Sequence, residues 1–285
     1  MNWDCDMASE RLIPIREVAR ITGVNPVTLR AWQRRHGLIK PQRTDKGHRL
    51  YSAADIDLIR EILYWLEQGV SIGKVKSLLA APKKTDSRPT DTSWDQARGD
   101  LLDLATSLSL DKLDRQLREL SKVYPAPLFL QRIVEPWLAD LASLDRPDRE
   151  ILQRCAEAIL MQFVHQVLTL KTGPRVAVAA MGKTPAYAIG LARYELLGMA
   201  IQSIDIGQLA PDQLSLARER LHVDAYILVL GGGLRGPWFS RYQPSWPENI
   251  FYVGPLGRLY QSETWLHRPY AEHVSQLEKF PPWET

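Results

Sequence analysis

Residues 21–37 read Ile21-Thr-Gly-Val-Asn-Pro-Val-Thr-Leu-Arg-Ala-Trp-Gln-Arg-Arg-His-Gly37, and this stretch decides the fold of the amino-terminal part of the chain. The apolar spacing before it predicts a short helix over residues 14–21. Gly23 ends that helix and permits a tight turn. Asn25-Pro26 then starts a second helix, because asparagine caps free helix amides and proline loses no hydrogen bond at the first position. With Gly37 closing the second helix, the pattern predicts a helix-turn-helix.

The second helix is expected to present a basic face. Val27 and Ala31 lie four residues apart, which points both toward the first helix. Thr28 and Arg30 lie near the helix N-terminus, where a recognition helix meets base edges. Trp32 leaves two alternatives open, a contact with nucleic acid or a position in the core. The remaining faces carry polar and basic residues: Thr28, Arg30, Gln33, Arg34 and Arg35.

A basic hairpin is predicted directly after this helix. Within residues 38–51, two short extended segments flank the turn sequence Thr44-Asp-Lys-Gly47. Ser52 and Asp55 give a capping-box-like start to a following helix, and residues 71–79 form one more. Such a hairpin is a wing that can lie along a sugar-phosphate backbone. Its basic side chains are Arg43, Lys46, His48 and Arg49.

Positive charge is concentrated in the same part of the chain. Residues 1–85 hold 15 Lys and Arg against 9 Asp and Glu, a net charge of +6, whereas residues 86–285 hold 21 against 24, a net charge of −3. Because phosphate neutralisation releases counterions, this asymmetry favours a polyanionic partner. A merely solvated basic face is the alternative on charge alone.

The composition is that of an ordinary globular protein, with 45% hydrophobic and 24% charged residues. No apolar run is long enough for a membrane helix, and the first residues do not resemble a signal peptide. Cys5 and Cys155 stand alone, without the spacing of a disulfide framework or a zinc site. We therefore expect a cytoplasmic protein that makes no membrane contact.

The rest of the chain divides by its pattern. Residues 81–93 are polar, contain two prolines and predict a linker between a winged helix-turn-helix over 1–80 and a four-helix bundle over 94–172. From residue 173 to 285, strands alternate with helices, which predicts a Rossmann-like parallel α/β domain. The fold class is therefore mixed α and α/β. The predicted strands are 176–180, 200–206, 225–230 and 249–253, with helices over 184–197 and 211–221.

Residues 12–80 resemble the MerR family of transcriptional regulators, and within it the MlrA-like branch. The runs that carry the resemblance are Ile15-Arg-Glu-Val-Ala19, Thr28-Leu-Arg-Ala-Trp-Gln-Arg-Arg-His-Gly-Leu38, Gly47-His-Arg-Leu-Tyr-Ser52 and Asp55-Ile-Asp-Leu-Ile59. The resemblance implies a recognition helix over 25–36, a wing around 47–49 and a homodimer on palindromic promoter DNA, with RNA polymerase or another regulator as candidate partners. The expected DNA-binding residues are Thr28, Arg30, Trp32, Arg34, Arg35, His36, Arg43, Lys46, His48, Arg49 and Tyr51.

The order of the three parts also resembles that of the CarH and LitR cobalamin photosensors. Those proteins need a cobalt-ligating histidine in the loop after the first strand, but the loop over residues 181–188 contains none. The position of their Glu-His pair, counted from Trp137, falls on Pro147-Asp148. We therefore expect a degenerate cobalamin-binding-type domain without a cofactor, which is sensor-like or binds a partner protein. A repressor that senses light through cobalamin, or senses another ligand, is the alternative.

Enzymatic activity is not expected. Gly231-Gly-Gly-Leu-Arg-Gly236 matches a dinucleotide-binding motif, but it follows the third strand and runs into Pro237. A strand-end turn is the simpler interpretation, although Arg235 beside three exposed amides is a candidate anion site. The six histidines show no metal or triad spacing, so we expect neither catalytic nor metal-binding residues.

Overall fold

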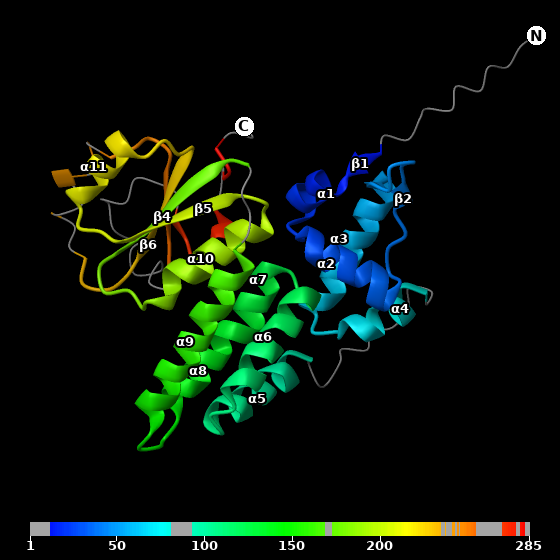
Figure 1. Ribbon diagram of the computed structural model, residues 1–285, viewed down its shortest axis with the longest axis horizontal. Coiled ribbons are helices and arrows are strands. Elements are labelled where there is room, and N and C mark those ends of the chain that lie inside the picture. Colours follow the sequence, from blue (N-terminus) through cyan, green and yellow to red (C-terminus); the bar gives the residue numbers. More distant parts are fainter. Residues whose placement is uncertain are drawn as a thin grey trace, which may run out of the picture.

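The computed structural model describes residues 12–80, 93–168, 173–234, 237, 241–242, 244, 246–254, 270–277 and 280–282. Its parts follow one another in chain order: a head with helices α1 to α4, a helical bundle, and a sheet flanked by helices (Figure 1). This confirms the predicted fold class. None of the helices in these ranges combines the length and apolar character needed to cross a bilayer.

The first two helices of the head lie within one residue of their predicted bounds. Helix α1 spans Ile15–Thr22, and Gly23 follows it with a φ of 68°, a conformation that side chains other than glycine rarely adopt. Helix α2 spans Pro26–Ala31 and continues as a π-helical stretch, η1, over Trp32–His36. The Asn25 side chain accepts hydrogen bonds from the amides of Val27 and Thr28, at 2.8 and 2.9 Å.

A small antiparallel sheet completes the head. Strands β2 (Gln42–Arg43) and β3 (Arg49–Tyr51) form the predicted hairpin, and β1 (Ile13–Pro14) pairs with the other side of β3. Strand β1 was not predicted, because two residues are too few to show alternation. A capping box between Ser52 and Asp55 opens α3 (Ala53–Glu67), and α4 (Ile72–Ala80) follows.

Four helical segments form the bundle, with the breaks that the sequence predicts. They are α5 (Ser93–Thr106), α6 (Leu110–Val123), a continuous run of α7 (Ala126–Phe129), η2 (Leu130–Val134) and α8 (Glu135–Ser143), and α9 (Arg149–Val167). Head and bundle share one hydrophobic core, in which α2 packs against α6. Of the predicted linker, residue 93 belongs to α5, and residues 81–92 lie outside the described part of the chain.

The last part is a five-stranded parallel sheet in the order β5-β4-β6-β7-β8. Helix α10 packs on this sheet and also on α9 of the bundle, so it joins the two parts. Strand β8 was not predicted, for the same reason as β1. The elements are β4 (Arg175–Met181), α10 (Tyr187–Gly198), β5 (Gln202–Gln208), α11 (Gln213–Arg220), β6 (Ala225–Leu230), β7 (Ile250–Val253), β8 (Tyr270–Ala271) and the short helix η4 (Val274–Gln276).

Candidate nucleic-acid interface

The face of the predicted recognition helix that is buried differs from the face that the sequence predicts. Its buried face carries Leu29 and Trp32, which are both fully buried, whereas Val27 is 53% exposed. The expectation that Val27 points toward α1 is therefore wrong, although Ala31 is buried as expected. Leu29 and Trp32 lie three residues apart and bury more apolar area than Val27 and Ala31, so they determine which face enters the core.

Three predicted DNA contacts are wrong because their side chains lie in the core: Thr28, Trp32 and Tyr51. The indole Nε1 of Trp32 donates a hydrogen bond to the backbone oxygen of Val123 on α6, at 2.7 Å. The alternative interpretation of Trp32 as a core residue is therefore correct. Tyr51 closes strand β3 and is 1% exposed, and Thr28 is fully buried.

The burial of Thr28 gives a first testable expectation. Its hydroxyl has no hydrogen-bond partner among the described residues, and such a group costs about 1–3 kcal/mol. Thr28→Val replaces it with a methyl group of similar shape, so we expect the free energy of unfolding to rise by about 1 kcal/mol. Urea denaturation measures this gain. A change in DNA sequence preference in the same variant would contradict the core position of Thr28.

Val27 and Arg30 of α2 lie three residues apart and are exposed, and Arg34 of η1 is exposed as well. Both arginines are exposed, as predicted. Val27 was missed as a candidate, and an exposed apolar side chain beside Arg30 is suited to a thymine methyl group. The signal that could have identified it is the large apolar pair Leu29 and Trp32 on the opposite face.

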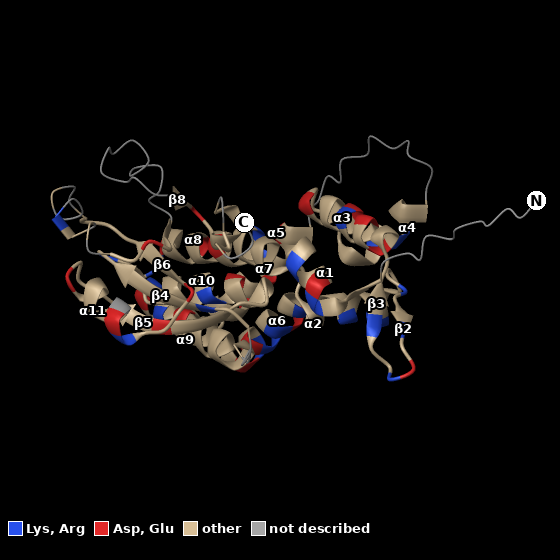
Figure 2. Cartoon of the chain, turned by 90° about the horizontal axis from the view of Figure 1, so that it is seen from above, with Lys and Arg blue, Asp and Glu red and all other residues tan. Residues whose placement is uncertain are grey.

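The wing is attached to the end of the predicted recognition helix. Figure 2 shows Lys and Arg along β2, β3 and the projecting turn between them. Arg49 of β3 donates a hydrogen bond from Nε to the side-chain oxygen of Gln33 in η1, at 2.7 Å. This contact fixes the base of the wing to the recognition helix. The exposed wing residues are Arg43, Lys46 and His48, and Arg49 is partly buried.

Two further predicted residues lie at the end of the recognition helix, toward the bundle. His36 is partly buried, and burial together with the neighbouring Arg35 lowers the pKa of its imidazole. Arg35 donates to Glu119 of α6 at 3.0 Å. A phosphate contact by Arg35 would have to compete with that carboxylate.

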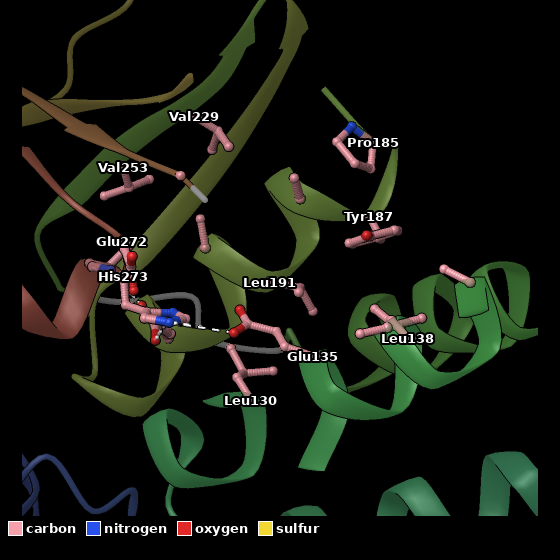
Figure 3. Close-up of a pocket in the computed structure, with 17 residues that line it drawn as sticks. Leu130, Glu135, Leu138, Pro185, Tyr187, Leu191, Val229, Val253, Glu272 and His273 are labelled. Atoms are coloured by element: carbon pink, nitrogen blue, oxygen red, sulfur yellow. Dashed lines mark hydrogen bonds and ion pairs between the residues drawn. The ribbon is translucent and has the colours of Figure 1, made fainter. Parts of the chain in front are cut away.

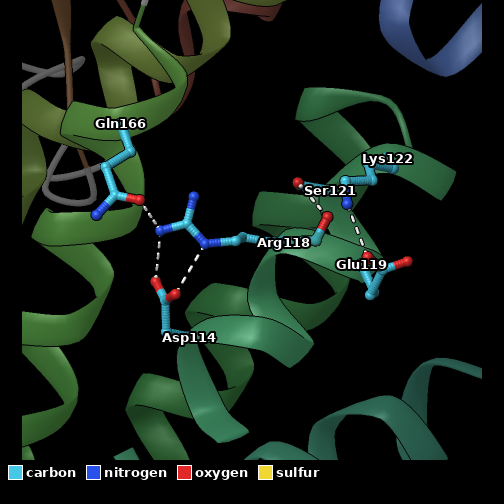
Figure 4. A network of polar contacts seen from close by, with 6 residues as sticks. All are labelled: Asp114, Arg118, Glu119, Ser121, Lys122 and Gln166. Atoms are coloured by element: carbon cyan, nitrogen blue, oxygen red, sulfur yellow. Dashed lines mark hydrogen bonds and ion pairs between the residues drawn. The ribbon is translucent and has the colours of Figure 1, made fainter. Parts of the chain in front are cut away.

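Helix α6, beside the recognition helix, carries basic residues that are paired with acids. Arg118 bonds Asp114 at 2.8 Å and also Gln166 of α9, and Lys122 bonds Glu119 at 2.7 Å (Figure 4). Four cations of the head differ from these paired residues in having no such acidic neighbour in the described part of the chain. In the ranges that the structure describes, no carboxylate lies within ion-pair distance of Arg30, Arg34, Arg43 or Lys46.

The glycine-rich loop after β6 is engaged with the loop after β4. The Gly231 amide donates to the oxygen of Met181 at 2.8 Å, and the Gly232 amide donates to the oxygen of Lys183 at 3.0 Å. A Cβ at position 231 would lie 2.3 Å from the Lys183 oxygen, so this close approach requires glycine. The expectation of exposed amides is wrong for these two residues. Arg235 and Gly236 lie outside the described residues.

Residues 13–82 match the model of the "MerR HTH family regulatory protein" family. The chain is 40% identical over 153 residues to the HTH-type transcriptional regulator MlrA of Salmonella typhimurium strain LT2. The matched segment covers 54% of this chain and 61% of that protein. The chain thus spans less than two thirds of the length of this relative. It is also 24% identical over 242 residues to the HTH-type transcriptional repressor CarH of Myxococcus xanthus, covering 73% of this chain and 79% of CarH.

One solved structure is also similar, a cobalamin-binding protein from Desulfitobacterium hafniense DCB-2. The TM-score is 0.30 at 12% identity, over 60% of this chain and 89% of that one. Within the described residues of the present chain, no group of three His, Cys, Asp or Glu side chains is arranged to hold a metal ion.

Proposed function

Because residues 13–82 carry a MerR-type helix-turn-helix and the chain is similar to MlrA-type regulators, we propose that the protein is a transcriptional regulator that binds promoter DNA as a homodimer. One observation carries the proposal. Arg49 of the wing is hydrogen-bonded to Gln33 of η1, so the wing is attached to the helix that precedes it, and both elements carry exposed cations.

In the proposed complex, α2 enters the major groove and the wing follows the backbone. Arg30 of α2 and Arg34 of η1 face base edges, because both side chains are exposed. Arg43, Lys46 and His48 contact phosphates, which position the protein without reading sequence. Two protomers related by a two-fold axis read half-sites about one helical turn apart.

Phosphate contact by the wing predicts a uniform loss of affinity in Lys46→Ala. The variant should bind every duplex more weakly, and the slope of log K against log salt should become shallower by about one unit. Gel-shift titrations at several salt concentrations, on promoter and on unrelated DNA, measure both quantities. Arg154→Ala is the matched control, because Arg154 lies on α9 with a side chain that is 82% exposed. Selective loss on the promoter alone would contradict the phosphate role.

We propose that the rest of the chain has a regulatory role and carries out no catalytic step. The bundle and the parallel sheet form a sensor-like or partner-binding body, with RNA polymerase or another regulator as candidate protein partners. We place this activity in the cytoplasm, where promoter DNA is accessible. Copurification of the full chain with RNA polymerase tests the first partner.

Cobalamin does not fit this body. No histidine occurs between β4 and α10, and the loop after β4 is bonded to the loop after β6. The cavity at the carboxyl ends of the parallel strands, between α8 and α10, measures about 380 Å³. Cavities of about 300–1,000 Å³ hold drug-sized ligands, and a corrin with its nucleotide tail is much larger. We therefore do not extend the proposal to a cobalamin photosensor.

A further inference from the structure

A cavity lies at the carboxyl ends of the parallel strands, between α8 and α10 (Figure 3). Val229 and Val253 contribute to it from the ends of β6 and β7. Ligands of parallel α/β sheets bind outside the carboxyl ends of the strands. The volume of about 380 Å³ falls in the range of cavities that hold small molecules. The cavity is therefore placed and sized for a small ligand.

Small and aliphatic side chains form most of the wall. Ala139 and Ala142 line the cavity from α8, and Ala188 and Ala192 line it from α10. Alanines fill little volume, so a slot remains between the two helices. Ala139 and Ala142 are exposed, and a ligand in the slot would remove their apolar surface from water. The wall is completed by Leu130, Leu138, Pro185, Tyr187 and Leu191.

One end of the cavity is polar and is built around His273. Its Nδ1 lies 3.4 Å from Glu195, which is 2% exposed. Glu195 also accepts hydrogen bonds from the amides of Val274 and Ser275, at 2.6 and 3.3 Å. Because these contacts already compensate the Glu195 carboxylate, it has no need of a cationic ligand. Its contact with Nδ1 orients the imidazole and leaves Nε2 to the side of Glu135.

The contact between His273 and Glu135 is longer than a good hydrogen bond. Nε2 lies 3.5 Å from the Glu135 carboxylate, whereas good hydrogen bonds measure about 2.7–3.2 Å. The Glu135 side chain is 41% exposed, so water solvates its charge. A hydroxyl group both donates and accepts, so it can donate to Glu135 and also bond Nε2 in either protonation state of the imidazole. This end of the cavity therefore suits a ligand hydroxyl.

We propose that this cavity binds a neutral, largely apolar molecule with one hydroxyl group, its ring between α8 and α10 and its hydroxyl against His273 and Glu135. A carboxylate ligand would place a like charge beside Glu135. An ammonium ligand would lose its hydration in an apolar slot, and an ion pair with a carboxylate as exposed as Glu135 returns little. The inference rests on the sensor part of the proposed function and names its ligand class.

Four naphthalenes of similar shape separate these contributions. 2-Naphthol carries the hydroxyl, 2-methoxynaphthalene lacks the donor, 2-naphthoate is an anion and 2-naphthylmethylammonium is a cation. Calorimetric titration of the full chain should show 2-naphthol binding with a dissociation constant of about 10–100 μM. The methyl ether should bind about tenfold more weakly, because it cannot donate to Glu135. The cation should bind more weakly than 2-naphthol, and 2-naphthoate should not bind.

Two variants fill the slot from opposite walls. Ala188→Phe on α10 and Ala139→Phe on α8 should each abolish binding of 2-naphthol and of its methyl ether. Ala139 is exposed, so its replacement is tolerated even if Ala188→Phe does not fold, and circular dichroism shows which variants fold. Ala158→Phe is the matched control, because Ala158 is exposed on α9 outside the cavity. It should bind both ligands as the unmodified chain does.

A third variant tests the polar end. Glu135→Leu keeps a side chain of similar size but removes the acceptor. The difference in affinity between 2-naphthol and its methyl ether should then fall to less than about threefold, with the affinity for the ether unchanged or higher. Glu150→Leu makes the same replacement at a side chain that is 77% exposed on α9, and it should preserve the tenfold difference.

The proposal is overturned if 2-naphthol does not bind at about 1 mM, if the cation or the anion binds more tightly, or if binding survives both slot-filling variants. An equal affinity for 2-naphthol and its methyl ether in the unmodified chain also overturns it. Titration of the same sample with DNA, without any naphthalene, keeps the outcomes distinct. DNA binding without 2-naphthol binding rejects only the ligand site, and the converse rejects only the DNA-binding proposal.

Discussion

Trp32→Ala is expected to lower the free energy of unfolding by about 3–5 kcal/mol, the cost of removing a large buried aromatic side chain. Trp32 is fully buried in one core with residues of α1 and α6, and its indole bonds the backbone oxygen of Val123. The variant therefore loses packing in the head and one hydrogen bond between head and bundle. Urea denaturation monitored by circular dichroism measures the loss.

Trp32→Phe separates the two contributions. It keeps most of the apolar packing but removes the donor to Val123, and we expect a smaller loss of about 1–3 kcal/mol. The Trp32→Ala variant also distinguishes a structural role of the indole from a role in DNA binding. If Trp32→Ala kept the stability of the unmodified chain and lost only DNA binding, the indole would have to contact DNA, and the docking of α2 on α6 described above would be wrong.

Arg30→Ala is expected to weaken binding to the target promoter by about 10- to 100-fold, equivalent to about 1–3 kcal/mol, and to relax the preference at one base position. Arg30 is exposed on α2. Its removal should therefore change the free energy of unfolding by less than about 0.5 kcal/mol. Competition gel shifts with single-base variants of the site measure affinity and preference together.

Arg154→Ala again provides the control, since it removes the same charge from the bundle. Lys46→Ala provides a second comparison, because a phosphate contact should weaken all duplexes alike. If Arg30→Ala also weakened all duplexes alike, or had no effect, base reading by this face of α2 would be contradicted.

The parts of the fold that depend on neighbouring residues could be predicted from the sequence. The asparagine cap at Asn25, the turn at Gly23 and the capping box of Ser52 and Asp55 act over three or four positions, and the structure shows all three. The buried strands β4, β6 and β7 were also predicted, because their apolar runs are continuous. Strands β1 and β8 have two residues each and exist only through their partners, so no local pattern indicates them.

The candidate site was harder to predict because it depends on contacts that are distant in sequence. The core position of Trp32 requires α6, which supplies the accepting oxygen from Val123. A helix as short as α2 also gives too few turns for its periodicity to identify the buried face, and Val27 was misplaced for that reason. The cavity around Glu135, Glu195 and His273 was not predicted, since three separate elements bring these residues together.

Recovery of genomic DNA fragments by the purified full chain, followed by sequencing, tests the central claim most directly. We expect fragments from promoters that share a two-fold symmetric motif, with half-sites about one helical turn apart. The same experiment with Arg30→Ala should return this motif weakened and degenerate at one position in each half-site. Fragments without a common motif, or an unaltered motif with Arg30→Ala, would contradict sequence-specific binding through this surface of the head.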